Sequence, residues 1–582
     1  MSITEEMIKY LLANPPKTEE DFGVVLRKIL RQEKNSPANI PTKTVLLKSY
    51  HKLLKQHKIK KSVQLEKLLI KRAVRTLSGV TIVTVLTKPF PCPGKCIYCP
   101  SEARMPKSYL SDEPAAARAL GLMFDPYQQV AQRLQALKNN GHPTDKVELI
   151  VKGGTWNSYP IKYQYWFIAR CFEACNGLSL RGEKRRSNPP NNEIAALLSV
   201  ARNDMLKLQK KNETAPHRII GLTVETRPDW INQRTILAMR EMGCTRVELG
   251  VQNTNDKILT LIKRGHDTKE IKRATKMLKN YGFKVDYHLM PQLPGSTPAT
   301  DLKMMLKVFD DPDYRPDMIK IYPCTVVKTS ELYEWLKRGE YKTYSDRKLI
   351  DMLKKFKARV PRYVRISRLI RDIPGHHIQA GNKMTNLRQV IQAEMAKEGL
   401  KCNCLRCREI GHQHIESKVK SLKSKVKLFV DKYEASGGTE YFISFEDIRR
   451  DVVFAFCRLR ILSLRGASND EAIPQSALPH HGIATLPSVT RDDKPYPAFI
   501  RELHTYGQLI NIGKKSKGAS QHIGMGVKLV KKAETICRQN KINKLAVISG
   551  VGVRGYYRKL GYTLENTYMV KNIKYERSYS GI

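Results

Sequence analysis

The sequence predicts an α/β protein: a partial barrel of parallel strands followed by a second, C-terminal α/β domain. From about residue 76 to 372, short apolar runs alternate with helical patterns, which favours a parallel sheet with crossover helices. A second pattern of strand-like runs and helices begins near residue 434. A chain of 582 residues is also too long for one hydrophobic core. We therefore expect several domains, two of them α/β.

Six strand-like runs define the expected barrel, and they cover residues 80–86, 146–156, 218–230, 245–252, 284–295 and 317–324. The helical segment FDPYQQVAQRLQALKNN lies between the first two. About six βα units fit a partial (βα)6-type barrel, whose functional loops follow the carboxyl ends of the strands. Strands of the C-terminal domain are expected at 439–447, 451–462, 499–512 and 544–552.

The segments flanking the barrel are basic or rich in cysteine. Residues 1–75 are expected to be helical, and between Lys48 and Thr76 ten Lys and Arg residues face one acid, Glu66. Too few acids are present to pair with them, which favours contact with nucleic-acid phosphates over a merely solvated surface. The expected domains are a basic helical segment that binds nucleic acid (1–75), the barrel (76–372), a cysteine-rich linker (373–433) and the C-terminal α/β domain (434–582).

Composition narrows the class of partner. Lys and Arg number 103 against 55 Asp and Glu, a net charge of +48, and a protein this basic usually meets RNA or DNA; a generally basic proteome is the alternative. No apolar run is long enough to cross a membrane, and the acidic start does not resemble a secretory signal. We expect a cytoplasmic protein without a membrane partner, in which clustered cysteines bind metal rather than form disulfides.

Three cysteines in the segment "PCPGKCIYCP" carry the first chemical signal. Cys92, Cys96 and Cys99 can hold three irons of a 4Fe–4S cluster and leave the fourth open to another ligand. A zinc site is the alternative, but structural zinc prefers four protein ligands. The C-x3-C-x2-C spacing after a first barrel strand, with Tyr98 before the last cysteine, resembles the radical S-adenosylmethionine (SAM) enzymes.

Polar residues at later strand ends suit the binding of SAM. Gly153 and Gly154 would let backbone amides approach its amino-acid part, although a simple tight turn is the alternative. In "VETRPDW", Glu225 and Arg227 could bind ribose hydroxyls and the SAM carboxylate, or form a structural salt bridge. Gln252 ends the following strand and is a further candidate contact.

A glycine-containing loop in the C-terminal domain carries the second signal. The segment "QHIGMG" precedes the helical "VKLVKKAETICRQ", an arrangement that presents amide N–H groups to a pyrophosphate. It resembles the coenzyme A loop of the GNAT acetyltransferases. The tail "GYYRKLGY" supplies Tyr556 and Tyr557; Tyr557 could touch a thioester, whereas packing is the alternative for both.

The linker carries the third signal, "KCNCLRCREIGHQH". Cys402, Cys404 and Cys407 are expected to bind zinc and to staple the linker, with His412 or His414 among the possible fourth ligands.

The whole arrangement resembles one family, the catalytic subunit of Elongator in its stand-alone prokaryotic form. The resemblance is carried by "CPGKCIYCPSEARMPKSYLSDEP", "DKVELIVKGGTW", "TVETRPDW", "RVELGVQ", "GNKMTNLRQ", "RELHTYG", "QHIGMG" and "ISGVGVRGYYRKLGY". It implies a tRNA carboxymethyluridine synthase that acts on the wobble uridine of the anticodon stem-loop, at position 34. SAM, a reducing electron donor and acetyl-CoA would be consumed: a radical forms on the acetyl methyl group, adds to uridine C5, and thioester hydrolysis releases CoA.

The resemblance also assigns residues. The acetyl-CoA contacts of the family fall on Lys146, Glu502, Leu503, His504, Thr505, Met525, Gly526, Val527 and Tyr557. The three-residue gap between Cys92 and Cys96 matches the prokaryotic form, so no obligatory protein subunits are expected. Zinc depends mainly on the cysteine spacing, since eukaryotic members lack this cysteine set. The catalytic residue that activates the hydrolytic water stays unassigned.

Two other functions fit parts of the sequence. A protein lysine acetyltransferase with a structural iron–sulfur cluster would use the C-terminal domain alone and would need a general base, for which Glu502 and His504 are the nearest options. An RNA-binding scaffold without turnover would use only the positive charge.

Overall fold

The fold comes from a computed structural model of the chain. It describes residues 2–16, 18–32, 40–70, 78–177, 197–412, 426–463, 496–506 and 524–574.

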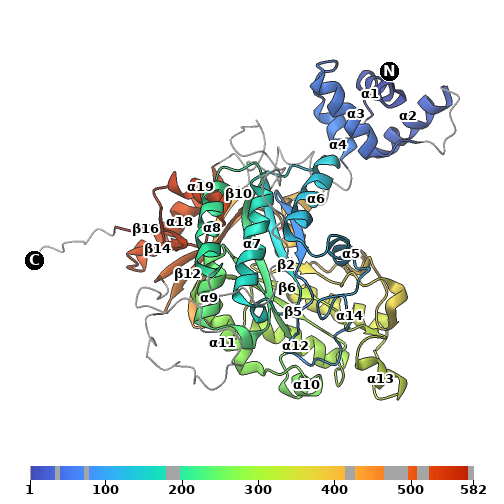
Figure 1. Cartoon of the computed structure of the whole chain (residues 1–582). Coiled ribbons are helices and arrows are strands. Elements are labelled where there is room, and N and C mark those ends of the chain that lie inside the picture. The colour runs from blue at the N-terminus through green and yellow to red at the C-terminus, as the bar shows by residue number, and fades with distance from the viewer. Residues whose placement is uncertain are drawn as a thin grey trace, which may run out of the picture.

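A seven-stranded, entirely parallel sheet forms the centre of the molecule, in the order β1-β2-β3-β4-β5-β6-β8 (Figure 1). Its strands are β1 (Thr81–Leu86), β2 (Lys146–Lys152), β3 (Arg218–Thr226), β4 (Arg246–Gln252), β5 (Lys284–Leu289), β6 (Met318–Ile321) and β8 (Arg365–Arg368). A small antiparallel pair, β7 (Val326–Val327) with β9 (Ile378–Ala380), lies outside it. The six expected strands are present, and β8 adds a seventh that the sequence pattern did not reveal.

Crossover helices connect these strands and cover the sheet. They include α5 (Pro114–Gly121), α6 (Pro126–Asn139), α7 (Ile161–Cys175), α8 (Leu197–Asn212), α9 (Gln233–Glu241), α10 (Asp256–Leu261), α11 (Thr268–Asn280), α12 (Pro298–Asp310), α13 (Leu332–Lys337) and α14 (Asp346–Arg359), and α15 (Leu387–Lys397) follows the last strand. Side-chain caps begin several of them; Asp125, for example, accepts the Gln128 amide at the start of α6. The apolar faces of α6 and α7 pack with β1 and β2 in the main core.

The C-terminal sheet contains the strands β10 (Val426–Ala435), β11 (Gly438–Asp447), β12 (Val453–Leu462), β13 (Ala498–Thr505), β14 (Lys544–Val547), β15 (Thr563–Glu565) and β16 (Tyr568–Asn572). All neighbouring pairs are antiparallel except β13 with β14. The helices α18 (Met525–Gln539) and α19 (Arg554–Arg558) belong to this part of the chain. β10 lies largely in the segment that the sequence assigned to the linker, so the sheet begins at Val426 rather than near residue 434.

Four helices at the N-terminus form a separate lobe beside α6 (Figure 1). They are α1 (Ile3–Ala13), α2 (Glu19–Gln32), α3 (Lys43–Lys55) and α4 (Val63–Leu69), and they enclose a small core of their own that includes Met7, Leu11 and Leu47. Thr44 of α3 donates to Asn140 Oδ1 just after α6, at 2.9 Å. The expected helical character of this segment agrees with the structure.

The two sheets are joined through a buried ionic contact. Arg501 of β13 binds both carboxylate oxygens of Asp317, which immediately precedes β6, at 2.8 and 2.5 Å, and also binds Glu440 of β11. The side chains of Arg501 and Asp317 are completely buried. This contact fixes the C-terminal sheet against the amino ends of the barrel strands.

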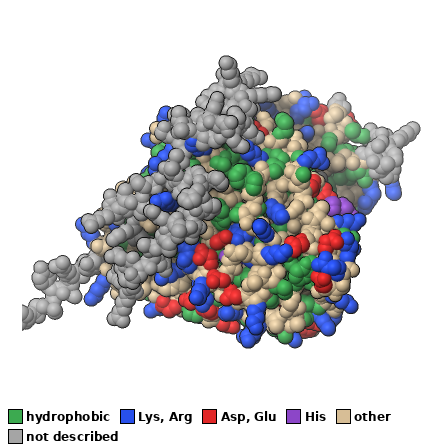
Figure 2. Space-filling view, turned by 60° about the horizontal axis from the view of Figure 1, so that its bottom comes forward, with side chains coloured by type: hydrophobic (Ala, Val, Ile, Leu, Met, Phe, Trp, Pro, Cys, Tyr) green, Lys and Arg blue, Asp and Glu red, His purple; other side chains and the backbone are tan. Residues whose placement is uncertain are grey.

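The outer surface carries both signs of charge. On the face shown in Figure 2, Lys and Arg side chains are interspersed with Asp and Glu. Within the described residues, no helix combines the length and the apolar character that a membrane crossing needs.

Candidate functional site

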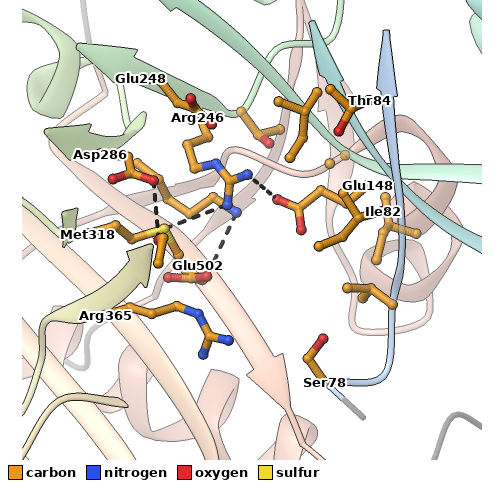
Figure 3. A pocket seen from close by; sticks show the side chains of 18 of the residues that line it. Ser78, Ile82, Thr84, Glu148, Arg246, Glu248, Asp286, Met318, Arg365 and Glu502 are labelled. Atoms are coloured by element: carbon orange, nitrogen blue, oxygen red, sulfur yellow. Dashed lines mark hydrogen bonds and ion pairs between the residues drawn. The ribbon is translucent and has the colours of Figure 1, made fainter. Parts of the chain in front are cut away.

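The interior of the central sheet holds a large cavity. Its volume is about 530 Å³, and residues from all seven parallel strands line it, so the sheet is curled around this space. Figure 3 shows Arg246 pointing across the cavity toward Glu148, to which it is paired at 2.7 Å, with Glu502 and Arg365 nearby. We call this space the barrel cavity.

The barrel cavity extends into the C-terminal sheet. Ile500, Glu502 and His504 of β13 line it, together with Val547 of β14 and Tyr557 of α19. β13 pairs with β14 only from Ala498 to Ile500, although β13 continues to Thr505. β14 ends at Val547, the partner of Ile500, so β13 continues beyond the paired segment, and Glu502, Leu503 and His504 there line the cavity at the amino ends of the barrel strands.

A second cavity, of about 150 Å³, lies at the carboxyl ends of the strands. Cys92, Cys96 and Cys99 line it, so we call it the cluster cavity. The structure thus places the three cysteines of the loop after β1 around one space, as their spacing predicts.

Two buried arginines support the cysteine loop. Arg264 Nη1 donates to Cys96 Sγ at 3.3 Å, and Arg227 Nη1 is buried without a hydrogen-bond partner among the described residues. A Cβ at Gly94 would lie 2.2 Å from Arg227 Nη1, so a larger residue there would displace this guanidinium. A hydrogen bond with Cys99, followed by the positive charge of Arg264 and Arg227, holds the pKa of Cys96 well below its usual value. The same hydrogen bond, together with burial, raises the pKa of Cys99 well above its usual value, so the surroundings favour the thiolate at Cys96 in particular.

The expected SAM contacts gather around the same cavity. Gly154, Glu225, Arg227 and Gln252 line it, whereas Gly153 does not. Gly153 has φ +142°, and a Cβ there would lie 1.8 Å from Thr87 Oγ1, which explains the glycine structurally.

The other polar residues at these strand ends have partly structural roles. Arg227 forms a two-pronged pair with Asp229, Nε–Oδ1 2.9 Å and Nη2–Oδ2 2.8 Å, so the salt-bridge interpretation holds for those two nitrogens. Gln252 has a positive φ of +67°, an uncommon conformation for this residue type. Such local strain often accompanies functional sites.

The two cavities adjoin. Five residues line both of them: Tyr109, Glu113, Lys152, Arg368 and Asp372. Tyr109 donates to Glu225 Oε2 at 2.6 Å, and Lys152 Nζ lies 3.6 Å from that same oxygen. The wall between the cavities thus consists of polar side chains, and the barrel interior connects the cluster end with the C-terminal sheet.

A polar network forms the inner surface of the barrel cavity near that wall. Glu248 Oε2 accepts from Lys152 Nζ at 2.6 Å, lies 3.0 Å from His288 Nε2, and also contacts Lys320 Nζ. Burial raises the pKa of Glu248, but Lys152, Lys320 and His288 outweigh it and hold the pKa well below the usual range. Glu248 is therefore ionised at neutral pH although its side chain is completely buried.

The expected coenzyme A contacts are only partly brought together. Glu502, Leu503, His504 and Tyr557 line the barrel cavity. Gly526, near the start of α18 between Met525 and Val527, lies close to them, because a Cβ on it would be 2.9 Å from Tyr556 Oη and 3.8 Å from Thr505 Oγ1. Lys146 begins β2 and does not line the cavity. Gln521, with the rest of residues 507–523, lies outside the described part of the chain.

His504 has a defined tautomer. Its Nε2 lies 2.9 Å from the carbonyl oxygen of Ser78, and because a carbonyl only accepts, Nε2 carries the proton and Nδ1 keeps its lone pair. Burial lowers the pKa of His504, against an opposing effect of Glu502. His504 is therefore neutral at pH 7 and has a basic nitrogen.

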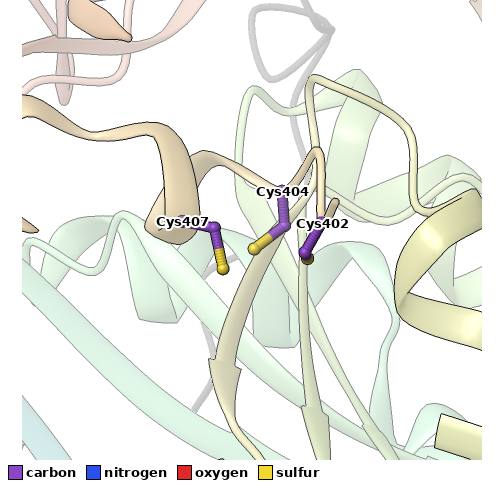
Figure 4. A group of neighbouring side chains, drawn as sticks. All are labelled: Cys402, Cys404 and Cys407. Carbon is purple, nitrogen blue, oxygen red and sulfur yellow. The ribbon is translucent and has the colours of Figure 1, made fainter. Parts of the chain in front are cut away.

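The linker cysteines form a compact group, shown in Figure 4. The Sγ atoms of Cys402, Cys404 and Cys407 all lie within 4.8 Å of one another. Thiolates that share a tetrahedral zinc ion at about 2.3 Å would be about 3.8 Å apart. His412 does not join this group among the described residues, and His414 lies outside them.

Family models match two parts of the chain. Residues 91–307 match the radical SAM superfamily, and residues 316–397 match the radical SAM C-terminal domain. The first range contains the cluster cysteines and the strands β2 to β5. The central domain therefore has the radical SAM fold.

Relatives match nearly the full length. The chain is 42% identical to the tRNA uridine(34) acetyltransferase of Methanocaldococcus infernus, over 87% of this chain and 88% of that protein. It belongs to the family of the tRNA uridine(34) acetyltransferases and Elongator complex protein 3.

Other members support this assignment. The tRNA uridine(34) acetyltransferase of Dehalococcoides mccartyi is 42% identical over 87% of this chain and 100% of its own length, and Elongator complex protein 3 of Danio rerio is 36% identical over 86% and 85%. The solved structure of M. infernus Elp3 with an N-terminal deletion is 39% identical, with a TM-score of 0.67, and covers 85% of this chain and 100% of that one. The expected family is confirmed.

Sequence reasoning missed the network around Glu248. Its members occupy inward positions of strands that otherwise read as apolar runs, in "RVELGVQ", "KVDYHL" and "MIKI". A charged residue within a strand buried on both faces must have a partner or a ligand, and that was the available signal.

Proposed function

We propose that the chain is a tRNA wobble-uridine modifying enzyme that forms 5-carboxymethyluridine at position 34 from acetyl-CoA and SAM. The observation that carries the proposal is the pair of adjoining cavities, one lined by the three loop cysteines and the other reaching the C-terminal sheet. Chemistry that needs groups from both ends requires such a connection. The relatives from M. infernus and D. mccartyi act on tRNA uridine(34), which supplies the substrate.

Cys92, Cys96 and Cys99 would hold a 4Fe–4S cluster. Arg227 Nη1 is buried and has no hydrogen-bond partner in the part of the chain that the structure describes, and this nitrogen and the lowered pKa of Cys96 fit an anionic group at this position. With a reducing electron donor, the bound cluster and SAM supply a 5′-deoxyadenosyl radical. Gly154, Glu225 and Gln252 would hold SAM in the cluster cavity. Gly153 would not contact SAM and would only allow the backbone turn beside it.

The C-terminal sheet would be a GNAT acetyltransferase domain that binds acetyl-CoA. Two features support this: β13 continues past Ile500 without pairing to β14, which ends at Val547, and α18 begins beside Thr505, with its first amides available to a pyrophosphate. Leu503 and Tyr557 would then face the thioester, and His504 would activate the water that releases CoA. Lys146, away from the cavity lining, would contact the outer part of coenzyme A.

Cys402, Cys404 and Cys407 would hold a structural zinc ion. The short distances between their sulfur atoms support the proposal. Separately, the N-terminal lobe would add phosphate contacts to tRNA. Metal analysis tests the first statement: Cys404→Ser should lose zinc while iron content stays unchanged, and zinc retained in full would contradict it.

Anaerobic turnover tests the function. Reduced, cluster-loaded protein incubated with SAM, acetyl-CoA and tRNA should yield 5-carboxymethyluridine after digestion to nucleosides, and Cys96→Ala should yield none. The alternative, protein acetylation with a structural cluster, predicts acetylated peptide that survives Cys96→Ala and no modified uridine.

A further inference from the structure

Two histidines and an aspartate converge at the surface, beside the wall of the cluster cavity. His377 Nε2 lies 2.7 Å and His376 Nε2 lies 3.0 Å from the same oxygen, Asp112 Oδ2. The possible ligand atoms of the three side chains all lie within 4.8 Å of one another. Within the described residues, Asp112 forms no ion pair with Lys or Arg, although Lys and Arg outnumber the acids by 103 to 55. This carboxylate is therefore approached by imidazoles rather than by the cations that abound in the chain.

Backbone structure positions the two histidines. They belong to the 3₁₀ turn Gly375–His377, in which the amide of His377 donates to the carbonyl oxygen of Pro374 at 3.1 Å. The centroids of the two rings are 4.2 Å apart, so the rings lie next to each other. β9 begins at the next residue and pairs with β7, which anchors the turn on its other side. Two ligands on one short, hydrogen-bonded turn lose little conformational freedom when they bind an ion.

A second contact already joins the two segments that carry these ligands. Arg371 Nη2 donates to Glu113 Oε1 at 2.8 Å, and Arg371 Nη1 donates to Ser108 Oγ at 3.0 Å. Glu113 is the neighbour of Asp112, and Arg371 precedes the histidine turn. Ser108, Glu113 and Arg371 all line the cluster cavity. The segment after the cysteine loop and the segment after β8 therefore form this part of the cavity wall together.

We propose that Asp112, His376 and His377 bind a divalent transition-metal ion, with zinc as the preferred metal. Two imidazole nitrogens and a carboxylate oxygen suit zinc and its neighbours in the first transition series, whereas Mg²⁺ and Ca²⁺ prefer oxygen ligands alone. The ion would add a metal bridge between the same two segments that Arg371 and Glu113 connect. The site takes no part in the proposed reaction, so its test is independent of tRNA and acetyl-CoA.

The geometry fits such an ion after a small adjustment. Ligands of a tetrahedral zinc ion at about 2.0–2.1 Å are about 3.3 Å apart, slightly more than the two Nε2–Oδ2 distances. The side chains can move apart, because that of His376 is 70% exposed and that of Asp112 is 38% exposed. The same exposure leaves room for water as the fourth ligand, so the ion should exchange with solvent.

Zinc titration of the full chain tests the proposal. The tag-free, cluster-loaded protein is dialysed anaerobically to remove loosely bound metal, and calorimetry then measures the uptake of added Zn²⁺. We expect one further zinc ion per chain. His376→Ala and His377→Ala should each weaken its binding by about 100-fold or more, since the loss of a group that only supports a ligand already costs about 10–100-fold.

Further variants distinguish this site from others. Asp112→Ala should weaken zinc binding as the histidine variants do, because the ion loses its anionic ligand. His51→Ala is the matched control, since His51 is an exposed histidine of α3 outside this group, and it should leave the titration unchanged. Cys404→Ser should also leave the exchangeable ion in place, because the linker cysteines are a separate group. Thermal unfolding without added zinc verifies that each variant is folded.

A metal site and a plain hydrogen-bonded cluster predict different titrations. Loss of the exchangeable ion in the three variants of this group, with the ion retained in His51→Ala and Cys404→Ser, supports the proposal. No further zinc uptake by the unchanged chain, or equal uptake by the unchanged chain and His377→Ala, would overturn it. An exchangeable ion lost only in Cys404→Ser would belong to the linker and would overturn it as well.

Discussion

At the scale of single residues, His504 illustrates how burial sets chemistry. The Ser78 carbonyl fixes the proton on Nε2, and the ring stacks on Phe456 with centroids 5.9 Å apart. Burial disfavours the imidazolium, so the pKa lies below the ordinary 6.5. A base of this kind stays unprotonated, and thus active, through the neutral range.

This gives a prediction for pH dependence. A base acts only when unprotonated, and its lowered pKa moves the acidic limb of the rate profile to lower pH. The rate of tRNA-dependent CoA release should therefore fall at acidic pH with a midpoint below the ordinary histidine value of 6.5. His504→Gln should reduce the rate by about 10²-fold or more without changing tRNA affinity. An acidic limb centred above pH 7, or an unaffected variant, would remove His504 from the hydrolytic step.

Sequence motifs identified residues whose spacing is local. Cys92, Cys96 and Cys99 share one loop, and their convergence follows from a tight turn. Lys152, Glu248 and Lys320 lie on three strands, far apart in sequence, and meet only because the sheet curls. No local sequence pattern predicts that these three side chains are in contact. Each charged residue within an apolar strand did indicate a buried partner or ligand.

At the scale of secondary-structure elements, the Asp317–Arg501 contact fixes the position of the C-terminal sheet relative to the barrel sheet. Arg501 also donates to the Phe283 carbonyl at 2.7 Å, so β13 is tied to the start of β5 as well as to β6. This geometry keeps Glu502 and His504 at the amino ends of the barrel strands. The contact is therefore a positioning device for the barrel cavity.

Asp317→Asn should destabilise the protein strongly. Arg501 keeps its contact with Glu440 but loses the carboxylate that it binds through two hydrogen bonds, and breaking such a buried pair costs about 3–5 kcal/mol. The expected result is a clearly lower thermal unfolding midpoint. Glu331→Gln is the control, because it breaks the exposed Lys263–Glu331 pair at 2.5 Å and should cost less than about 1 kcal/mol. Similar effects of the two changes would contradict the role of the buried contact.

The sequence predicted most elements but missed several short or edge strands, of which β8 and β10 are the most informative. β8 reads "RISR" and has neither an apolar run nor enough length to stand out. β10 reads "VKLFVDKYEA", an edge strand with alternating exposed residues, and its basic flank suggested linker. Both are defined by the strands they pair with, and pairing is a tertiary property that a single-sequence pattern does not contain.

At the scale of the whole molecule, some of the excess lysines form ion pairs with acidic side chains and others do not. In the N-terminal lobe Lys52 pairs with Glu5 at 2.7 Å and Lys61 lies 3.4 Å from Glu66, so these two lysines have acidic partners that the linear sequence only partly indicated. Lys55, Lys58 and Lys60 are exposed, and no ion pair within the described residues involves them. They are the better candidates for phosphate contact.

Replacing Lys55, Lys58 and Lys60 by Glu should weaken tRNA binding regardless of the base at position 34. For every lysine that binds a phosphate, its replacement should flatten the dependence of log Kd on log salt by about one unit. Titrations at several salt concentrations measure this slope. An unchanged slope would exclude the lobe from the RNA-binding surface.

The central claim is that one reaction uses both cavities: the cluster cavity, and the end of the barrel cavity lined by His504 and Tyr557, where the thioester of acetyl-CoA is proposed to bind. Anaerobic turnover with acetyl-CoA trideuterated at its methyl group tests it most directly, by mass spectrometry of the 5′-deoxyadenosine formed. If the two adjoining cavities serve one reaction, the 5′-deoxyadenosine should carry one deuterium, with carboxymethyluridine formed in the same mixture. Undeuterated 5′-deoxyadenosine, while carboxymethyluridine accumulates, would contradict the account.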